Sequence, residues 1–293
     1  MRTGFRHWCR ALSWLAGLLL LSACNSPFEH SGTKLQDLRA SGVIRVGYAN
    51  EIPYAYLDSQ TGKLTGEAPA IAEHILKRLG IERVEPVLTE FGALIPGLKA
   101  HRFDMIAAGM YILPERCSEV SFSNPTYSIG EGFIVKSGNP LALHSYADIA
   151  KRDDARIGVV AGAVERRYAQ QLGIPDERIV VFPNLPSALA GVEAGRVDAA
   201  AGTSLSLRLL AQKEAPGRVQ LAKPFYDPVV DGKPVRGYGA FVFRREDYNL
   251  VATFNAHLKS FIGTPEHLEL IKPFGFTRVE LPGRLTAEQL CER

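Results

Sequence analysis

The sequence lacks the clustered residues on which most enzymes and metalloproteins depend. Its 293 residues include seven histidines and only four cysteines, and the histidines are scattered along the chain. We find no combination of serine, histidine and aspartate, no cysteine and histidine pair and no metal-ligand spacing among them. The sequence therefore favours a function that uses no catalytic residues, no metal and no cofactor.

A long apolar run occurs at the N-terminus, at residues 12–21, but it is too short to span a membrane, which needs about 20 apolar residues. Three arginines precede this run, at Arg2, Arg6 and Arg10. Leu21-Ser22-Ala23-Cys24 follows and resembles the lipobox of bacterial lipoproteins; an ordinary secretory signal with a chance cysteine is the alternative. We therefore expect residues 1–23 to be a signal peptide, Cys24 to be lipid-modified, and residues 24–33 to tether a periplasmic domain to the membrane.

An excess of charge is also lacking once export is considered. The whole chain has 34 basic and 31 acidic residues, and removal of the signal peptide with its three arginines leaves 31 of each. A nucleic-acid partner would call for a basic stripe on the protein. The balanced charge therefore argues against binding to nucleic acid.

The few cysteines agree with export. Cys9 lies in the expected signal peptide and Cys24 is the expected anchor, which leaves Cys117 and Cys291 in the folded part. Two cysteines in an oxidising compartment can pair, although two unpaired buried thiols are the alternative. We predict a disulfide between Cys117 and Cys291, which would tie the C-terminal tail to the segment that holds Arg116.

Strand-like and helix-like segments alternate along the chain, which predicts an α/β fold. The first half reads as strands at 43–48, 84–88 and 105–108, with helices at 35–40, 71–79 and from residue 91. The second half repeats the pattern, with strands at 156–160, 178–182 and 197–201 and helices at 164–172 and 186–194. Short links between these segments predict parallel sheets covered by helices.

Length and a weak internal repeat predict two lobes. About 270 mature residues exceed the usual size of one core. The sequence GLKAHRFDMIA at 97–107 also aligns with GVEAGRVDAAA at 191–201, since both read as a helix end followed by a strand. With crossing strands at 135–140 and 238–243, we expect lobe 1 at 34–136 and 237–293, lobe 2 at 137–236, and a hinged cleft between them.

The segment 103–127 is the first candidate for a binding site. Its apolar strand is expected to end on Gly109, where the backbone can approach a neighbour closely, and the loop after it carries Tyr111 and Arg116 with Pro114 between them. An aromatic ring and a guanidinium at a strand end suit a small carboxylate with an apolar or cationic body. The alternative is a solvated surface arginine and a tyrosine that serves packing.

Several segments together carry a resemblance to a known family. VGYANEIPYAY, FGALIPGLKAHRFDMIAAG, ILPERCSEVSFSNPTY, IVKSGNP and GRVDAAAG resemble, in order and spacing, the substrate-binding proteins of ABC importers for polar amino acids and osmolytes (solute-binding protein family 3). The PERC stretch, the SGNPL stretch and the leucine-cysteine ending are most similar to the ectoine and hydroxyectoine binders of that family. The resemblance implies a two-lobed type II periplasmic binding protein with two hinge strands.

The resemblance also implies a ligand site. An aromatic cage would be formed by Tyr54, Phe91 and Tyr111, with Arg116 on the ligand carboxylate and Glu51 on the cationic ring nitrogens. For Phe91, at a helix start, a plain core role is the alternative. The second lobe would add backbone amides of the turn that ends at Val164.

Two departures from the family pattern bear on the ligand. The usual Gly-Gly-Thr turn of the second lobe reads Ala161-Gly162-Ala163-Val164 here, so its hydroxyl is missing. Many amino-acid binders also place an aspartate for the ammonium where this chain has Gly202-Thr203-Ser204. The missing aspartate disfavours an ordinary amino acid and suits an ectoine-like zwitterion, which lacks a free primary ammonium.

We therefore expect a monomeric solute receptor that closes around a small zwitterion and presents it to an ABC permease in the inner membrane. A binder of polar or cationic amino acids is one alternative. A periplasmic enzyme similar to cyclohexadienyl dehydratase, with Glu165 or Glu51 as the acidic group, is another. A sensory receptor that passes its signal to a membrane protein is a third, and the sequence does not separate it from a transport component.

Overall fold

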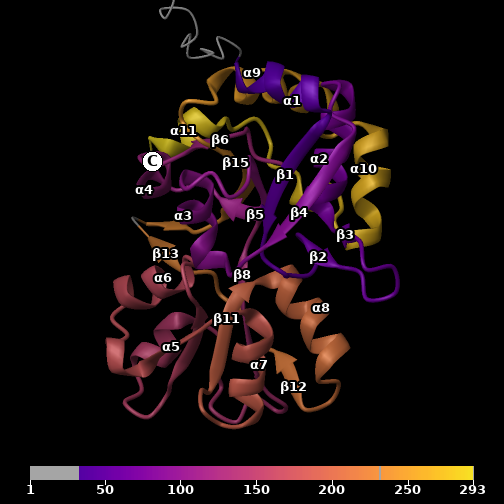
Figure 1. The fold of residues 1–293 in the computed structure, drawn as a ribbon. Coiled ribbons are helices and arrows are strands. Elements are labelled where there is room, and N and C mark those ends of the chain that lie inside the picture. The colour runs from indigo at the N-terminus through magenta and orange to yellow at the C-terminus, as the bar shows by residue number, and fades with distance from the viewer. Residues whose placement is uncertain (1–32, 231, 293) are drawn as a thin grey trace, which may run out of the picture.

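The computed structural model describes residues 33–230 and 232–292 and consists of two open sheets, each flanked by helices (Figure 1). The expected signal peptide, Cys24 and all of the tether except Thr33 lie outside the described residues. Within the described residues, no helix has both the length and the apolar character that crossing a membrane requires. Mixed α/β architecture with two sheets agrees with the expected fold.

The first sheet has three adjacent parallel strands on one side and antiparallel strands on the other. Strand β1 pairs in parallel with β4 and with β5, and β15 pairs antiparallel with β5, β6 and β7. The strands run in the order β4 (Arg83–Leu88), β1 (Val43–Tyr48), β5 (Met105–Tyr111), β15 (Gly237–Phe243) and β6 (Ser121–Phe122), with β7 (Tyr127–Ile129) also on β15.

The second sheet repeats this arrangement. Strand β9 pairs in parallel with β10 and β11, and β8 pairs antiparallel with β11 and β12. The order is β10 (Ile179–Phe182), β9 (Ile157–Val160), β11 (Ala199–Thr203), β8 (Glu131–Lys136) and β12 (Val219–Leu221). Both sheets are therefore mixed rather than purely parallel, because the strand that crosses between lobes joins each sheet in the opposite direction.

Helices cover the sheets with apolar faces. In α2 the residues Ile71, Ile75 and Leu76 repeat at helical spacing and are fully buried. The helices around the first sheet are α1 (Lys34–Ser41), α2 (Glu67–Arg78), α3 (Leu94–Lys99), α4 (Pro114–Cys117), α9 (Tyr248–Phe261), α10 (Pro265–Ile271) and α11 (Ala287–Cys291). Those around the second sheet are α5 (Tyr146–Ala150), α6 (Glu165–Gln171), α7 (Leu185–Glu193) and α8 (Ser204–Glu214).

Two short hairpins and several short 3-10 helices complete the fold. The hairpins pair β2 (Tyr56–Leu57) with β3 (Leu64–Thr65) and β13 (Val229–Val230) with β14 (Lys233–Pro234). The 3-10 helix η1 (Phe91–Ala93) precedes α3, so the helix expected from residue 91 begins as a tighter turn. The second hairpin lies in the segment that returns from the second sheet to β15.

The chain crosses between the sheets earlier than expected. We placed the end of the first part of lobe 1 at residue 136, but β8 pairs with β11 and β12 across its whole length, so residues 131–136 belong to the second sheet. Gly130 therefore lies at the crossing, between β7 of the first sheet and β8 of the second. The return crossing ends at Gly237, where β15 begins, one residue before the strand that we expected at 238–243.

Candidate functional site

A cavity lies where the carboxyl ends of the parallel strands of both sheets face each other. It encloses about 490 Å³, including its opening to solvent. Such strand ends are the usual place for ligands in α/β sheets. All six predicted binding residues line it: Glu51, Tyr54, Phe91, Tyr111, Arg116 and Val164. The other lining residues are Ala108, Gly109, Val160, Ala163, Glu165, Leu185, Ala201, Gly202 and Thr203.

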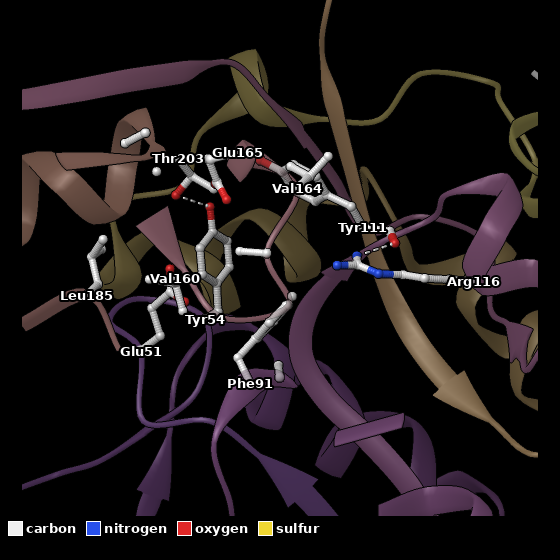
Figure 2. A pocket seen from close by; sticks show the side chains of 15 residues that line it. Glu51, Tyr54, Phe91, Tyr111, Arg116, Val160, Val164, Glu165, Leu185 and Thr203 are labelled. Atoms are coloured by element: carbon white, nitrogen blue, oxygen red, sulfur yellow. Dashed lines mark hydrogen bonds between the residues drawn. The ribbon is translucent and has the colours of Figure 1, made fainter. Parts of the chain in front are cut away.

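Tyr54 lies at the centre of the cavity wall and reaches across to the second lobe (Figure 2). Its hydroxyl donates to Thr203 Oγ1 at 2.9 Å, and its ring stacks on Tyr127 with 5.0 Å between the ring centroids. Gly109 has a φ of +62°, and a Cβ there would lie 2.7 Å from the Tyr54 ring. The close approach expected at Gly109 is therefore an approach to Tyr54.

Tyr111 belongs to a strand and not to the loop that we predicted. Strand β5 continues through Gly109 and ends at Tyr111, because β15 pairs with its last residues, with Gly239 opposite Tyr111. The Tyr111 side chain is 5% exposed, and its hydroxyl has no hydrogen-bond partner among the described residues. Its ring packs on the backbone of Gly237, where no side chain interferes.

Arg116 brings positive charge to the cavity. It lies on the short helix α4 and not in an open loop; its Nη1 donates to the Tyr111 carbonyl at 2.9 Å and its Nη2 to the Gly162 carbonyl of the second lobe at 2.8 Å. Its guanidinium carbon lies 5.6 Å from the centroid of the Phe91 ring. Burial lowers the pKa of Arg116, and the nearby Glu165 partly offsets this effect. The remaining N–H groups suit a carboxylate.

Two carboxyl groups bring acidity to the same cavity, the partly buried Glu51 from the first lobe and the buried Glu165 from the second. Glu51 follows β1 and accepts a hydrogen bond from Ser206 Oγ of α8 at 2.8 Å. Burial raises the pKa of Glu51 to about 7, although the bond from Ser206 favours its carboxylate. Burial likewise raises the pKa of Glu165 to about 7, against the opposing effects of a backbone amide and of Arg116. Both groups can therefore change charge near neutral pH.

The turn between β9 and α6 forms the second-lobe edge of the cavity. Gly162 has a φ of +77°, and a Cβ there would lie 2.5 Å from the Cα of Gly92 in the first lobe. Val164 is buried and precedes the first residue of α6. The Ala163 amide already donates a hydrogen bond to the Val160 carbonyl. Of the backbone amides that we expected this turn to offer to a ligand, that of Ala163 is therefore occupied.

Several lining residues were not among the predicted ligand contacts. Glu165 was considered only as an acid for the enzyme alternative, and its position directly after the second-lobe turn was the signal that it faces the cleft. Thr203 lies in the segment Gly202-Thr203-Ser204, where the sequence has no aspartate. In the structure its hydroxyl oxygen accepts the hydrogen bond from Tyr54. Val160 is the last residue of β9, and Leu185 begins α7 shortly after the end of β10. These positions at strand ends of the second sheet were the sequence signal that the two residues could line the cavity.

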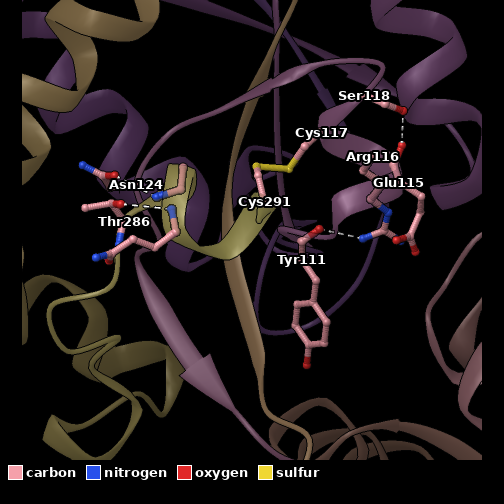
Figure 3. Close-up of a disulfide and its surroundings, with 10 residues drawn as sticks. Tyr111, Glu115, Arg116, Cys117, Ser118, Asn124, Thr286 and Cys291 are labelled. Atoms are coloured by element: carbon pink, nitrogen blue, oxygen red, sulfur yellow. Dashed lines mark hydrogen bonds between the residues drawn. A yellow bond between two sulfur atoms is a disulfide. The ribbon is translucent and has the colours of Figure 1, made fainter. Parts of the chain in front are cut away.

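The structure pairs Cys117 with Cys291 in a disulfide, with 5.8 Å between their Cα atoms (Figure 3). Cys117 directly follows Arg116 on α4, and Cys291 is the last residue of α11. Helix α11 is also held at its start, where the Ala287 amide donates to Asn124 Oδ1 at 3.1 Å. The C-terminal helix is therefore linked to the element that carries Arg116.

The arrangement suits a small molecule that carries a carboxylate and a cation. Arg116 is the only basic residue that lines the cavity in the described chain, and it is accompanied by two carboxyl groups and three aromatic rings. Among the described residues, no group of three or more histidine, cysteine, aspartate or glutamate side chains is placed to hold a metal ion. Ring faces attract a delocalised cation, and a guanidinium holds a carboxylate bidentately.

Comparisons with known proteins agree on the kind of protein. Residues 44–276 match the family described as bacterial extracellular solute-binding proteins, family 3. A probable amino-acid ABC transporter periplasmic-binding protein of Sinorhizobium fredii is 42% identical over 262 residues, which cover 88% of this chain and 85% of the relative.

Solved structures share the fold. The crystal structure of EhuB in complex with hydroxyectoine is similar with a TM-score of 0.80 and 36% identity, covering 88% of this chain and 97% of that one. The ancestral amino acid-binding protein AncCDT-1, a precursor of cyclohexadienyl dehydratase, is similar with a TM-score of 0.69 and 25% identity, covering 83% and 99%. These structures are two-lobed periplasmic binding proteins, and the present fold is of the same kind.

Proposed function

The chain belongs to the bacterial extracellular solute-binding proteins of family 3, and we propose that it binds a small zwitterion of the ectoine and hydroxyectoine class for an ABC importer. The ligand would lie in the cavity between the lobes. Closure of the lobes would enclose it, since both lobes contribute contacts.

The observation that carries this proposal is the separation of charge across an aromatic wall. In Figure 2, Arg116 lies at one side of the cavity and Glu51 at the other, with Tyr54 and Phe91 between them. A zwitterion with its carboxylate on Arg116 would have its cation against the rings and near a carboxylate. The proposal assigns ligand contact to the six predicted residues and, from the second lobe, to Glu165.

The absence of an acidic residue after β11 supports a ligand without a primary ammonium. Thr203 ends β11, and its hydroxyl accepts a hydrogen bond from Tyr54 instead of facing the ligand with a negative charge. A compact ammonium is strongly hydrated and needs such a carboxylate, whereas a cyclic amidinium spreads its charge over an aromatic face. The similar structure of EhuB holds hydroxyectoine, which supports the same ligand class.

We propose further that the protein is exported, processed before Cys24 and held at the membrane by a lipid on that residue, and that it acts as a monomer. These parts of the proposal rest on the N-terminal pattern, because Cys24 lies outside the described residues. Delivery of the solute to a permease in the inner membrane follows from membership of the family. A sensory receptor that passes a signal to a membrane protein would use the same closure of the lobes.

Binding of a polar or cationic amino acid is the second candidate function. The most similar of the relatives reported above is a probable amino-acid binder, and two carboxyl groups in the cavity, Glu51 and Glu165, could neutralise an ammonium and a cationic side chain. This candidate predicts that arginine or a similar amino acid competes with ectoine for the cavity.

Catalysis on the same fold is the third. Glu165 is a buried acid whose pKa is raised to about 7 by burial, a value that suits proton transfer. The similarity to AncCDT-1 makes prephenate and arogenate the substrates to test. Product formed from either one, at a rate that Glu165→Gln abolishes, would favour an enzyme over a receptor.

Calorimetric titration of the mature domain with ectoine, hydroxyectoine, proline betaine, arginine and glutamine tests the proposal. We expect saturable binding of ectoine or hydroxyectoine and much weaker binding of the two amino acids. Saturable heat with an amino acid, and none with either ectoine, would contradict the proposed ligand class and leave the amino-acid receptor.

A further inference from the structure

Ser206 of the second lobe reaches the acidic side of the cavity without lining it. It is the third residue of α8 and is 0% exposed. Its Oγ lies 2.8 Å from Glu51 Oε1 and 2.6 Å from the Ile52 carbonyl oxygen, and both acceptors belong to the first lobe. Ser206 is not among the residues that line the cavity. The site as described so far therefore gives this buried hydroxyl no role in binding.

The Ser206 hydroxyl can serve Glu51 in either charge state of the carboxyl group. A serine hydroxyl has one proton to donate and can also accept. When Glu51 is a carboxylate, Ser206 donates to it across the 2.8 Å contact. When Glu51 carries a proton, it can donate to Ser206 Oγ, while the hydroxyl proton serves the Ile52 carbonyl at 2.6 Å. The link between Ser206 and the Glu51 carboxyl therefore does not depend on the charge of Glu51.

The first lobe fixes the backbone of Glu51 but not its carboxyl group. The Glu51 amide donates to the Ala55 carbonyl at 2.8 Å, and the Ala55 amide donates back to the Glu51 carbonyl at 3.0 Å. Among the described residues, the Glu51 carboxyl has no hydrogen-bond partner other than Ser206. A glutamate side chain has several rotamers, and ordering it costs conformational entropy. Ser206 therefore selects one orientation of the carboxyl before a ligand arrives.

The start of α8 makes a second contact with the same part of the first lobe. Thr203, directly before the helix, accepts the hydrogen bond from Tyr54. Ser206 lies in the first turn of this 11-residue helix, and the positive end of a helix favours a nearby carboxylate. The charged and titratable groups around Glu51 are Tyr54, Tyr127, Arg116 and Glu165 on the cavity side, and Tyr56, Glu90 and Lys213 along the grooves outside it.

We propose that Ser206 is a positioning residue that holds one oxygen of the Glu51 carboxyl, so that the other oxygen faces the cation of the ligand. The inference deepens the proposed function and rests on it. Ser206 comes from the second lobe and Glu51 from the first, so the cationic half of the site is complete only when the lobes are closed. Ser206 acts through Glu51 and does not touch the ligand, since it does not line the cavity. Recognition of the cation is thereby coupled to closure.

The contact can be tested without a ligand. In protein with ¹³C-labelled glutamate carboxyl groups, NMR would follow the titration of Glu51, assigned by the loss of its resonance in Glu51→Gln. Burial raises the pKa of Glu51 to about 7, and the bond from Ser206 opposes this effect. Ser206→Ala, which suits a helix interior, should therefore raise the pKa of Glu51 further, by about half a unit or more. An unchanged titration of Glu51 in this variant would overturn the proposal.

Ser204→Ala is the matched control for both readouts. Ser204 is the first residue of the same helix, its hydroxyl has no hydrogen-bond partner in the described part of the chain, and it does not line the cavity. The Glu51 titration should be the same in Ser204→Ala as in the unmodified protein. The affinity of this variant for a solute should stay within about twofold of the unmodified value.

Ligand affinity gives the second readout, through a double-mutant cycle with ectoine as the probe. Calorimetry should show about tenfold weaker binding by Ser206→Ala than by the unmodified protein, because a hydrogen bond to a charged group is lost. In a Glu51→Ala background, the same change should weaken binding by about twofold or less, since Ser206 then has no carboxyl group to hold. Equal losses in the two backgrounds would show that Ser206 only links the lobes through the Ile52 carbonyl, and would contradict the inference.

The two readouts separate failure of this inference from failure of the proposed function. If arginine binds and ectoine does not, the proposed ligand class fails, and the same cycle with arginine still decides the role of Ser206. If no solute of the panel binds the unmodified protein, the proposed function fails, and the NMR titration still decides whether Ser206 holds the Glu51 carboxyl.

Discussion

The two lobes use the same junction between a helix end and the third parallel strand, but they add different chemistry to it. In the first lobe the Asp104 amide donates to the Arg45 carbonyl and the Arg45 amide donates back to Asp104 Oδ2. In the second, Asp198 and Arg156 make the same two hydrogen bonds. The repeated sequence at 97–107 and 191–201 therefore encodes a structural joint, which explains why it occurs in both lobes.

The joints differ in what surrounds the aspartate. Asp104 is buried and also contacts three cations: Lys34 at 2.7 Å, Arg45 at 3.0 Å and the buried Arg244 at 3.6 Å. For Asp198, the structure gives the bond to the Arg156 backbone. The first lobe thus has a buried charge network beneath its sheet, while it also presents most of the rings and the guanidinium to the cavity. The second lobe contributes mainly small residues and Glu165.

The largest expected effect tests this difference in the joints. Asp104→Asn should lower the free energy of unfolding by about 3 kcal/mol, because it leaves Arg244 buried without its full complement of negative charge. The same change at the equivalent position, Asp198→Asn, should cost about 1 kcal/mol or less, because one hydrogen bond to a backbone amide is weakened. Urea denaturation of both variants measures the contrast. Equal losses would mean that the charge network contributes nothing beyond the shared joint.

The same network makes acid stability depend on Asp104. Burial opposes ionisation of Asp104, but hydrogen bonds from Arg45 and Lys34 outweigh it and lower its pKa to about 2. A lowered pKa means that the carboxylate stabilises the folded state above the unfolded value and that this stability is lost as the pH falls to about 2. The loss amounts to about 2 kcal/mol, and Asp104→Asn should remove that part of the pH dependence.

Next in size is the effect of removing the guanidinium from the cavity. Arg116→Ala should weaken binding of a carboxylate ligand about 100-fold or more, because the ligand charge would be left without its partner in a desolvated site. Arg196→Ala is a matched control, since Arg196 also lies over a ring, Phe182 at 5.3 Å, but away from the cavity. Titration calorimetry should show near-normal affinity for the control. Comparable affinity in Arg116→Ala would remove Arg116 from the proposed site.

The disulfide gives the first lobe a covalent link that the second cannot have, since the sequence has no cysteine between Cys117 and Cys291. Replacement of both cysteines by serine should lower the free energy of unfolding by about 2 to 4 kcal/mol, because the unfolded chain gains freedom. The affinity should fall as well, since α4 carries Arg116. Chemical denaturation and thiol counting check this; two reactive thiols in the mature unfolded protein before reduction would show that no bridge exists.

The smallest expected effect separates contacts between lobes from contacts within one. Tyr54→Phe removes the hydroxyl that donates to Thr203 across the cleft and should weaken ligand binding by about 1 kcal/mol, or about fivefold. Tyr127→Phe removes a hydroxyl that donates to the Gly109 carbonyl within the first lobe, at 2.7 Å, and should lower stability with little change in affinity. Equal affinities for the two variants would indicate that the contact between lobes does not contribute to closure.

Most of the fold was accessible from local patterns. The alternation of strands and helices, the stop at Gly42 after α1 and the strand expected at 238–243 agree with the structure, because turns, capping residues and apolar runs leave local signals. The direction of the crossing strands left no such signal. The sequence pattern led us to expect residues 131–136 in lobe 1, and only their pairing with β11 assigns them to the second.

The site was accessible in part for a different reason. Tyr54, Phe91 and Arg116 lie after strand ends, where an α/β sheet presents ligand contacts, so their convergence could be expected. The hydrogen bond from Tyr54 to Thr203 could not, because it joins residues of the two lobes that lie 149 positions apart in the sequence. Such pairings depend on how the two crossings bring the lobes together.

The contact between Gly92 and Gly162 separates how tightly this protein binds from what it prefers to bind. A methyl group at position 162 would lie 2.5 Å from the Gly92 Cα, so any side chain there holds the rims of the two halves apart. The energetic penalty falls on the approach of the halves and is therefore common to every solute. Substitutions at these two glycines would change the affinity for every solute by the same factor. The receptor could then serve at higher or lower solute concentrations while its order of preference stayed the same.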